Sequence, residues 1–145
     1  AQAVIDVVIY PRLVQILGHS SKEVQDDALR AIVLIVMRDT SLIHLIQPLI
    51  SNEVLPILTS FISSPDSSIQ VRASQLFYCI ISQGSTEQIR AVVSQGCVRS
   101  FCGVLTSSHV GTVKLGLRGL LKVLKFGRKE CDQTGTLLFA MKFNG

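Results

Sequence analysis

Apolar residues recur at three- and four-residue spacing within segments that turn-forming residues separate. This spacing places the apolar side chains on one side of a helix, whereas a half-buried strand would alternate with a period of two. Helices are therefore predicted along the whole chain. The longest span about 22–38, 69–82 and 110–125, and shorter ones span 40–46, 53–62, 85–94 and 97–105, with a weak one at 137–143.

The helical pattern repeats along the chain. Pro11 aligns with Pro56 at an offset of 45 residues, and Pro56 aligns with Arg99 at an offset of 43. The segments that follow keep the same offsets. A helical period in the low-to-mid forties is typical of armadillo and HEAT-type arrays. The sequence thus predicts an all-α fold, a right-handed armadillo-repeat superhelix (an α-solenoid) of about three repeats.

The predicted array occupies residues 1–130. Its repeats span about 10–46, 54–93 and 97–130, after the end of a preceding repeat at 1–9, and 131–145 form a C-terminal tail or an incomplete repeat. Neither end carries the polar outer face that terminal repeats need, so the chain is either part of a longer array or a shortened descendant of one. Because both ends expose apolar faces, we expect it to self-associate or to bind hydrophobic dyes.

The composition suits helices that are buried on several sides. Apolar residues make up 48% of the chain, and the mean hydropathy is +0.45. The longest uncharged runs, 73–86 and 100–113, have 14 residues each. They are shorter than the roughly 18 residues that a membrane span needs, so we expect no membrane partner. We also expect no signal peptide, because Asp6 interrupts the first apolar stretch.

No pattern indicates chemistry at a catalytic or metal site. The cysteines at 79, 97, 102 and 131 have neither metal-ligand spacing nor clustered histidines. The chain has no phosphate-binding glycine loop after a strand, no nucleophile elbow and no prominent carboxylate pair. We therefore expect no enzyme, no catalytic residues, no metal and no cofactor, and a reducing compartment, the cytosol or the nucleus.

Charge divides unevenly between the two halves of the chain. Residues 1–66 hold four Lys/Arg against seven Asp/Glu, and residues 67–145 hold ten against three. A basic half fits an acidic partner or nucleic acid, or solvated side chains on outer helix faces. Nucleic acid is the weaker prediction, because the basic run at 122–129 lacks the interleaved aromatics of a stacking surface, with Phe126 as its single aromatic residue. Asp26 and Arg30 predict an ion pair, either in a groove or on a plain surface.

Several strings of residues within the repeats are distinctive. They are Tyr10-Pro11-Arg12-Leu13-Val14, Ala28-Leu29-Arg30-Ala31-Ile32, Leu55-Pro56-Ile57-Leu58, Glu87-Gln88-Ile89-Arg90, Ser94-Gln95-Gly96-Cys97-Val98 and Gly119-Leu120-Leu121-Lys122-Val123-Leu124-Lys125. They resemble consecutive armadillo repeats of the importin-α (karyopherin-α) family, from the C-terminal half of that family's array. The resemblance covers roughly residues 1–130 and does not extend to 131–145.

The resemblance implies an adaptor for protein import into the nucleus, present in the cytoplasm and the nucleus. Such an adaptor holds a lysine-rich nuclear localisation signal, in extended form, along a concave groove. Each third helix of the family typically offers a Trp, whose ring stacks on a lysine, and one turn later an Asn, which bonds the peptide backbone. The family's basic importin-β-binding segment has no counterpart in this chain.

The groove positions depart from the family pattern. No Trp occurs in the chain, and none of the expected Asn positions holds an Asn. Two hypotheses remain. The chain is an importin-α-like nuclear import adaptor, a fragment or divergent member with its signal-binding residues largely lost, or it is an armadillo-type scaffold for a different, possibly acidic, partner. By register the Trp positions hold Arg30, Gln75 and Arg118, and the Asn positions hold Leu34, Cys79 and Lys122.

We predict that a lysine-rich nuclear localisation peptide binds this chain poorly. Each lost Trp–Lys contact removes about 0.5–2 kcal/mol, and Arg118 and Lys122 repel the lysines. Titration of a fluorescent Lys-rich peptide measures this affinity. Saturable submicromolar binding would contradict the prediction, and placing Trp at Gln75 and Asn at Cys79 should raise the affinity.

Overall fold

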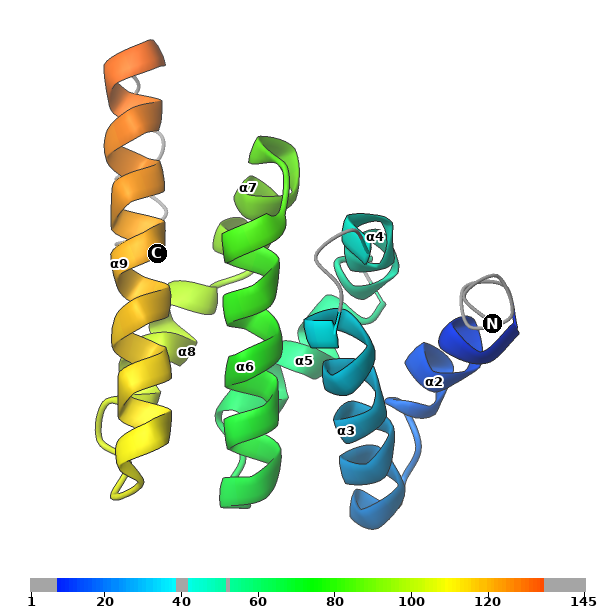
Figure 1. The fold of residues 1–145 in the computed structure, drawn as a ribbon. Helices are drawn as coiled ribbons and strands as arrows, with labels where there is room; N and C mark the ends of the chain where they lie inside the picture. Colours follow the sequence, from blue (N-terminus) through cyan, green and yellow to red (C-terminus); the bar gives the residue numbers. More distant parts are fainter. Residues whose placement is uncertain (1–7, 39–41, 52, 135–145) are drawn as a thin grey trace.

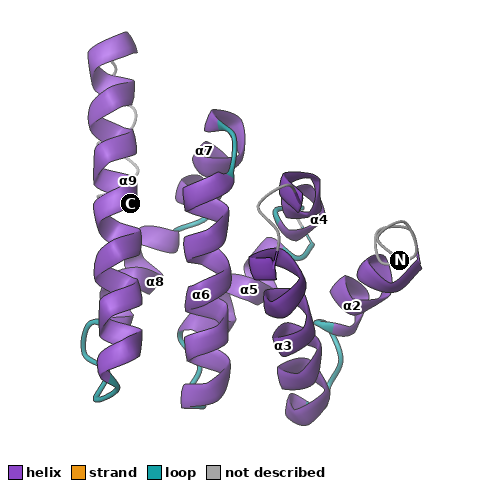
Figure 2. Ribbon diagram, in the orientation of Figure 1, coloured by secondary structure: helices purple, strands orange, loops and turns teal. Residues whose placement is uncertain are grey.

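The computed structural model of the chain describes residues 8–38, 42–51 and 53–134. Every regular element in these ranges is a helix (Figures 1 and 2), which agrees with the predicted all-α fold. The elements are α2 (Tyr10–Ile16), α3 (Lys22–Arg38), the 3₁₀ helix η2 (Leu42–Leu45), α4 (Ile46–Leu49), α5 (Leu55–Ile62), α6 (Ser67–Gln83), α7 (Thr86–Ser94), α8 (Cys97–Val104) and α9 (Val110–Thr134).

The three long helices α3, α6 and α9 lie side by side in one layer (Figure 1). Helix α6 packs between α3 and α9, and the shorter helices α2, α5 and α8 pack on α3, α6 and α9 in turn. Each short helix thus covers one side of its own long helix, and the next long helix covers another side. This arrangement is an α-solenoid, as the repeat period predicted.

Two glutamines show the repeat register in atomic detail. The Gln25 side-chain amide donates to the Leu17 carbonyl at 3.2 Å, and the Gln70 amide donates to the Ile62 carbonyl at 2.9 Å. In both repeats the long helix thereby satisfies a carbonyl at the end of the preceding short helix, where helical partners are missing. Donors and acceptors are each 45 residues apart, as the sequence offset predicted.

Local capping decides where α6 and α7 begin. The Asp66 carboxylate accepts from the backbone N–H groups of Ser68 at 2.9 Å and Ile69 at 3.4 Å. An Asp in this position satisfies two donors that a helix start leaves unpaired, so α6 begins two residues before the predicted start. Ser85 and Gln88 form a capping box at α7.

Helix α9 does not end where the sequence predicted. We expected a break at Gly127, but the helix continues to Thr134. A glycine inside a helix costs only about 1 kcal/mol relative to alanine. Beyond it, Glu130 accepts from Arg90 of α7 at Nε (3.0 Å) and Nη2 (2.7 Å), which holds the extended end against its neighbour. The predicted helix at 137–143 and the start of the one at 40–46 lie outside the described residues.

The core is one continuous cluster that runs through all three repeats. Tyr10 is fully buried, and its hydroxyl donates to the Leu45 carbonyl at 2.8 Å, which ties α2 to η2. Burial raises the pKa of Tyr10. Between the second and third repeats, the rings of Phe77 and Phe101 meet edge to face with their centroids 6.2 Å apart. Over the described residues, no helix is both long and apolar enough to cross a membrane.

Phe101 also requires a glycine on the facing helix. A Cβ at Gly119 would lie 2.8 Å from Phe101 Cζ, and the ring is held because it is fully buried against Phe77. We predict that Gly119→Ala lowers the free energy of unfolding by about 1–3 kcal/mol through overpacking. Urea denaturation followed by circular dichroism measures the change.

Gly103 provides the matched control. It lies inside α8 with no atom within 4 Å of a built Cβ, so Gly103→Ala should raise the free energy of unfolding by about 0.5–1 kcal/mol. Equal effects of the two substitutions would show that α8 and α9 do not approach as described.

Candidate peptide-binding face

The six predicted groove residues lie on the three long helices that pack side by side. Arg30, Leu34, Arg118 and Lys122 are exposed, and Gln75 is half-buried. Cys79 differs from the others, because its side chain is buried at 7% exposure. We call the surface that these helices share the third-helix face. It consists of Arg30 and Leu34 on α3, Gln75 and Cys79 on α6, and Arg118 and Lys122 on α9.

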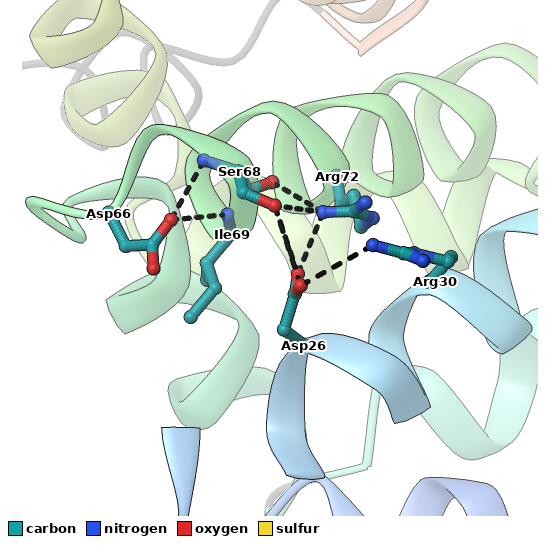
Figure 3. Close-up of polar contacts among 6 residues, drawn as sticks. All are labelled: Asp26, Arg30, Asp66, Ser68, Ile69 and Arg72. Atoms are coloured by element: carbon teal, nitrogen blue, oxygen red, sulfur yellow. Dashed lines mark hydrogen bonds and ion pairs between the residues drawn. The ribbon is translucent and has the colours of Figure 1, made fainter. Parts of the chain in front are cut away.

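An ion-pair cluster joins α3 to α6 on this face (Figure 3). The predicted pair of Asp26 and Arg30 is present, with 3.8 Å between Asp26 Oδ2 and Arg30 Nη2. The closer partner of Asp26 is Arg72 of α6, whose Nη1 donates to Asp26 Oδ1 at 2.7 Å. Ser68 also donates to Asp26 Oδ1, at 3.3 Å. The cluster therefore bridges two repeats, which the intrahelical pair alone would not do.

The sequence analysis missed Arg72. The repeat offset could have indicated it, because the position 45 residues after Asp26 is residue 71, directly before Arg72. The side chains of Asp26 and Arg72 are 21% and 20% exposed, whereas Arg30 is 55% exposed. A short, half-buried bond between charged groups contributes more than a solvated pair does. The cluster neutralises the carboxylate nearest to α6, so little negative charge remains there for a ligand.

A shallow hollow lies beside the cluster. Its volume is about 330 Å³. The first half of α6 forms most of its wall, and the turn before α9 adds one side chain. Its polar side chains include the Gln75 amide and the Arg72 guanidinium, which can hydrogen-bond or attract an anion. The lining residues are Ser67, Ser68, Val71, Arg72, Gln75 and His109.

Helix α9 carries an exposed line of positive charge. Its members are spaced by three or four residues, so they lie on one side of the helix. Among the described side chains of α6 and α9, the single acidic one is Glu130, which is bound to Arg90. The sequence predicted a basic half, and the continuation of α9 past Gly127 aligns the charges. This basic stripe consists of Lys114, Arg118, Lys122, Lys125 and Lys129, all exposed.

Comparisons with known proteins agree with this geometry. No family model matches the chain. Importin subunit alpha-B of Dictyostelium discoideum is 39% identical over 54 residues, which cover 37% of this chain and 10% of that protein. Importin subunit alpha-3 of Arabidopsis thaliana is 28% identical over 172 aligned positions, which cover 89% of this chain and 32% of that protein. The chain thus spans at most about a third of the length of these relatives.

Solved structures share the fold. An engineered protein from the Northeast Structural Genomics Consortium superposes with a TM-score of 0.73 and 26% identity, over 92% of this chain and 33% of that one. The designed armadillo repeat protein YIII(Dq)4CqI superposes with a TM-score of 0.69 and 19% identity, over 85% and 52%. These similarities support a divergent or partial importin-α/armadillo-type protein. The resemblance seen in the sequence is thereby confirmed.

The third-helix face has three equivalent positions with different exposure. Leu34 is 65% exposed, Cys79 is 7% exposed and Lys122 is exposed. Leu34 has no described repeat before it, whereas Cys79 lies between two long helices. Burial raises the pKa of the Cys79 thiol. Within the described part of the chain, no three His, Cys, Asp or Glu side chains are grouped to hold a metal ion.

We predict that the cysteines differ sharply in reactivity. Burial raises the pKa of Cys97 to about 12 and also raises that of Cys79, whereas Cys102 is exposed. Because the thiolate is the reactive form, Cys79 and Cys97 should react with a thiol reagent roughly a hundredfold or more slowly than Cys102 at pH 8. The measurement is made in a Cys131→Ser background.

Cys102→Ser is the control and should remove the fast phase. If a fast phase persists in that variant and maps to Cys79 by mass spectrometry, the third-helix face is open at Cys79 rather than closed.

Proposed function

We propose that this importin-α-like chain is a protein-binding scaffold that holds an extended acidic segment over α6 and α9. The observation that carries the proposal is the basic stripe, five exposed Lys and Arg side chains on one side of α9. It supports an acidic ligand in place of a lysine-rich one. The proposal makes the chain an interaction module and not an enzyme.

The stripe has the length of a short peptide. Fifteen helical residues separate Lys114 from Lys129, which corresponds to about 22 Å along α9. An extended peptide advances roughly 3.3–3.6 Å per residue, so about six or seven of its residues would follow the stripe. Lys and Arg side chains reach several ångströms from the helix and can pair with carboxylates on either side of such a segment.

Neighbouring groups support binding at the α6–α9 end in particular. Exposed Glu23 and Asp27 on α3 would repel an acidic segment at the other end of the face. The hollow beside Gln75 can take one side chain, and the Gln75 amide can both donate to and accept from a peptide backbone. An acidic ligand is thus favoured over α6 and α9 and disfavoured over α3.

The relatives favour a second candidate, a role in nuclear import. Both curated relatives are named as importin subunits. Under this candidate the chain binds nuclear localisation signal cargo, weakly because the Trp and Asn positions are changed, and it is present in the cytoplasm and the nucleus. The Lys-rich peptide titration separates the two candidates, since an acidic-segment scaffold should bind that peptide more weakly than a Glu-rich one.

We predict that Arg118→Ala/Lys122→Ala weakens binding of a fluorescent Glu-rich octapeptide about tenfold. Two lost exposed charge contacts contribute about 1–2 kcal/mol together, which corresponds to that factor. Fluorescence anisotropy measures the affinity, which should also fall as salt is raised, because exposed charges are screened.

Arg12→Ala/Lys22→Ala removes the same charge from exposed positions away from α9 and is the matched control. It should leave the affinity within about twofold. Tighter binding of the Lys-rich peptide than of the Glu-rich one would contradict the proposal. So would tighter binding of a single-stranded oligonucleotide, which would make nucleic acid the ligand of the stripe.

A further inference from the structure

Helix α9 exposes a second stripe, made of leucines and adjacent to the basic one. Leu117, Leu121 and Leu124 are 54%, 53% and 57% exposed. Their spacing of four and three residues places them on one side of the helix. Three aligned, half-exposed leucines are an apolar patch of the kind that marks an interaction surface. We call them the leucine stripe.

Inside the array, the next repeat covers the positions of the leucine stripe. In α3 all three equivalent residues are buried, although no repeat is described before that helix. Helix α8 packs on α9 and still leaves the leucine stripe exposed, so we assign the cover of the equivalent α3 residues to the repeat that follows, whose helix α6 packs on α3. Within the described residues, no repeat follows α9 to cover the leucine stripe. Counted back by 43 residues, the leucine stripe corresponds to Ser74, Tyr78 and Ile81 in α6. Counted back by a further 45 residues, it corresponds to Leu29, Val33 and Val36 in α3.

The opposite end of the array shows the reverse pattern. Ile16 of α2 is 37% exposed, whereas the equivalent Phe61 and Val104 are 7% and 0% exposed. Val104 lies beside Gly116 of α9 in its own repeat, and its helix α8 also packs on α5 of the repeat before it, whereas no repeat is described before α2. Ile9 is likewise exposed, whereas the equivalent Cys97 is fully buried. These two isoleucines mark what we call the leading face.

We propose that the leucine stripe of one copy packs on the leading face of a second copy, so that the chain stacks head to tail with itself. The contact would repeat the packing between neighbouring repeats that the structure shows twice. Within the array, the next repeat packs on α3 and on α6. In the proposed contact, the leading face of a second copy packs on α9 in the same way.

Charges at the repeat junctions support a second copy. Where α3 meets α6, Asp26 of the earlier helix bonds to Arg72 of the later one. Where α6 meets α9, the equivalent positions hold Val71 and Leu115, both half-buried. The two positions thus hold compatible residues at each junction: opposite charges between α3 and α6, and two apolar residues between α6 and α9.

The proposed junction would also have a matched pair. The position equivalent to Asp26 at the end of the array is Lys114, and the position equivalent to Arg72 at its start is Asp27. Both side chains are exposed, and their charges are opposite. In the Asp26–Arg72 pair the earlier helix carries the acid, whereas in the proposed pair it carries the base. Unlike charges meet only when the end of one copy faces the start of the next.

Head-to-tail contacts join two different surfaces and do not close on themselves in a pair. The average mass should therefore rise with concentration beyond that of a dimer. Leu121→Glu blocks the leucine stripe and Ile16→Glu blocks the leading face, so each variant alone should be monomeric by sedimentation velocity. An equimolar mixture of the two should form a 1:1 dimer and nothing larger, because one usable face remains on each.

A charge exchange tests the register. Asp27→Lys and Lys114→Glu should each weaken the association constant roughly tenfold, and the double variant should restore it because the pair is re-formed with its signs exchanged. Met37→Glu, at an exposed apolar position of α3 outside both faces, is the control and should change nothing.

Three results would overturn the proposal outright, and a fourth would replace it with tail-to-tail pairing. The first three are a wild-type chain that stays monomeric at high concentration, an equimolar mixture that stays monomeric although both variants are folded by circular dichroism, and a double variant as weak as either single one. Association that Leu121→Glu abolishes but Ile16→Glu leaves intact would also overturn it, in favour of tail-to-tail pairing.

Discussion

The rest of the structure depends on the cover that each long helix receives from the next. A solenoid helix is apolar on more than one side, so its own short neighbour cannot bury it completely. Leu29 and Val36 are buried on α3, which packs against both α2 and α6. This packing also fixes the third-helix face, since Arg30 follows Leu29, Gln75 follows Ser74 and Arg118 follows Leu117. Successive residues of an α-helix are rotated by about 100°. The orientation that turns one residue towards the next repeat therefore also fixes the direction of the following residue, on the third-helix face.

Stacking and ligand chemistry therefore use different sides of the same helices. The side that stacks must stay apolar and closely packed, as Phe101 and Gly119 show. The side that faces a ligand carries no such constraint, because its residues are exposed in the absence of a ligand. By the predicted register, Arg30 and Arg118 occupy positions where the importin-α family has Trp, and such an exchange needs no change to the stack. An armadillo-type fold can thus be kept while the residues on this side differ.

The fold could be predicted from the sequence because periodicity reports which sides of a helix are buried. The limits of α3 were predicted to the residue, and those of α6 within two, since capping by Asp66 and not apolar spacing sets its start. The end of α9 was predicted wrongly, because Gly127 signals a break locally while the bond between Arg90 and Glu130 is made across two helices. Bonds of this kind depend on the geometry of the stack.

The same limitation applies to the candidate face. The register located its six positions on neighbouring helices but gave neither the burial of Cys79 nor the contact of Arg72 with Asp26. Cys79 is on α6, which packs between α3 and α9, whereas Leu34, at the same register position, is on α3, which has one long helix described beside it. The side chain at a given position is thus open or closed according to its place in the array.

Lys114 connects the two proposals, because it belongs both to the basic stripe and to the proposed junction with Asp27. A carboxylate of a bound acidic segment and the carboxylate of Asp27 would compete for the same ammonium group. Occupancy of the stripe should therefore weaken stacking, and stacking should weaken binding by the same factor, since coupling between two binding equilibria is reciprocal. The leucine stripe lies outside this competition, so an acidic ligand would reduce head-to-tail association without abolishing it.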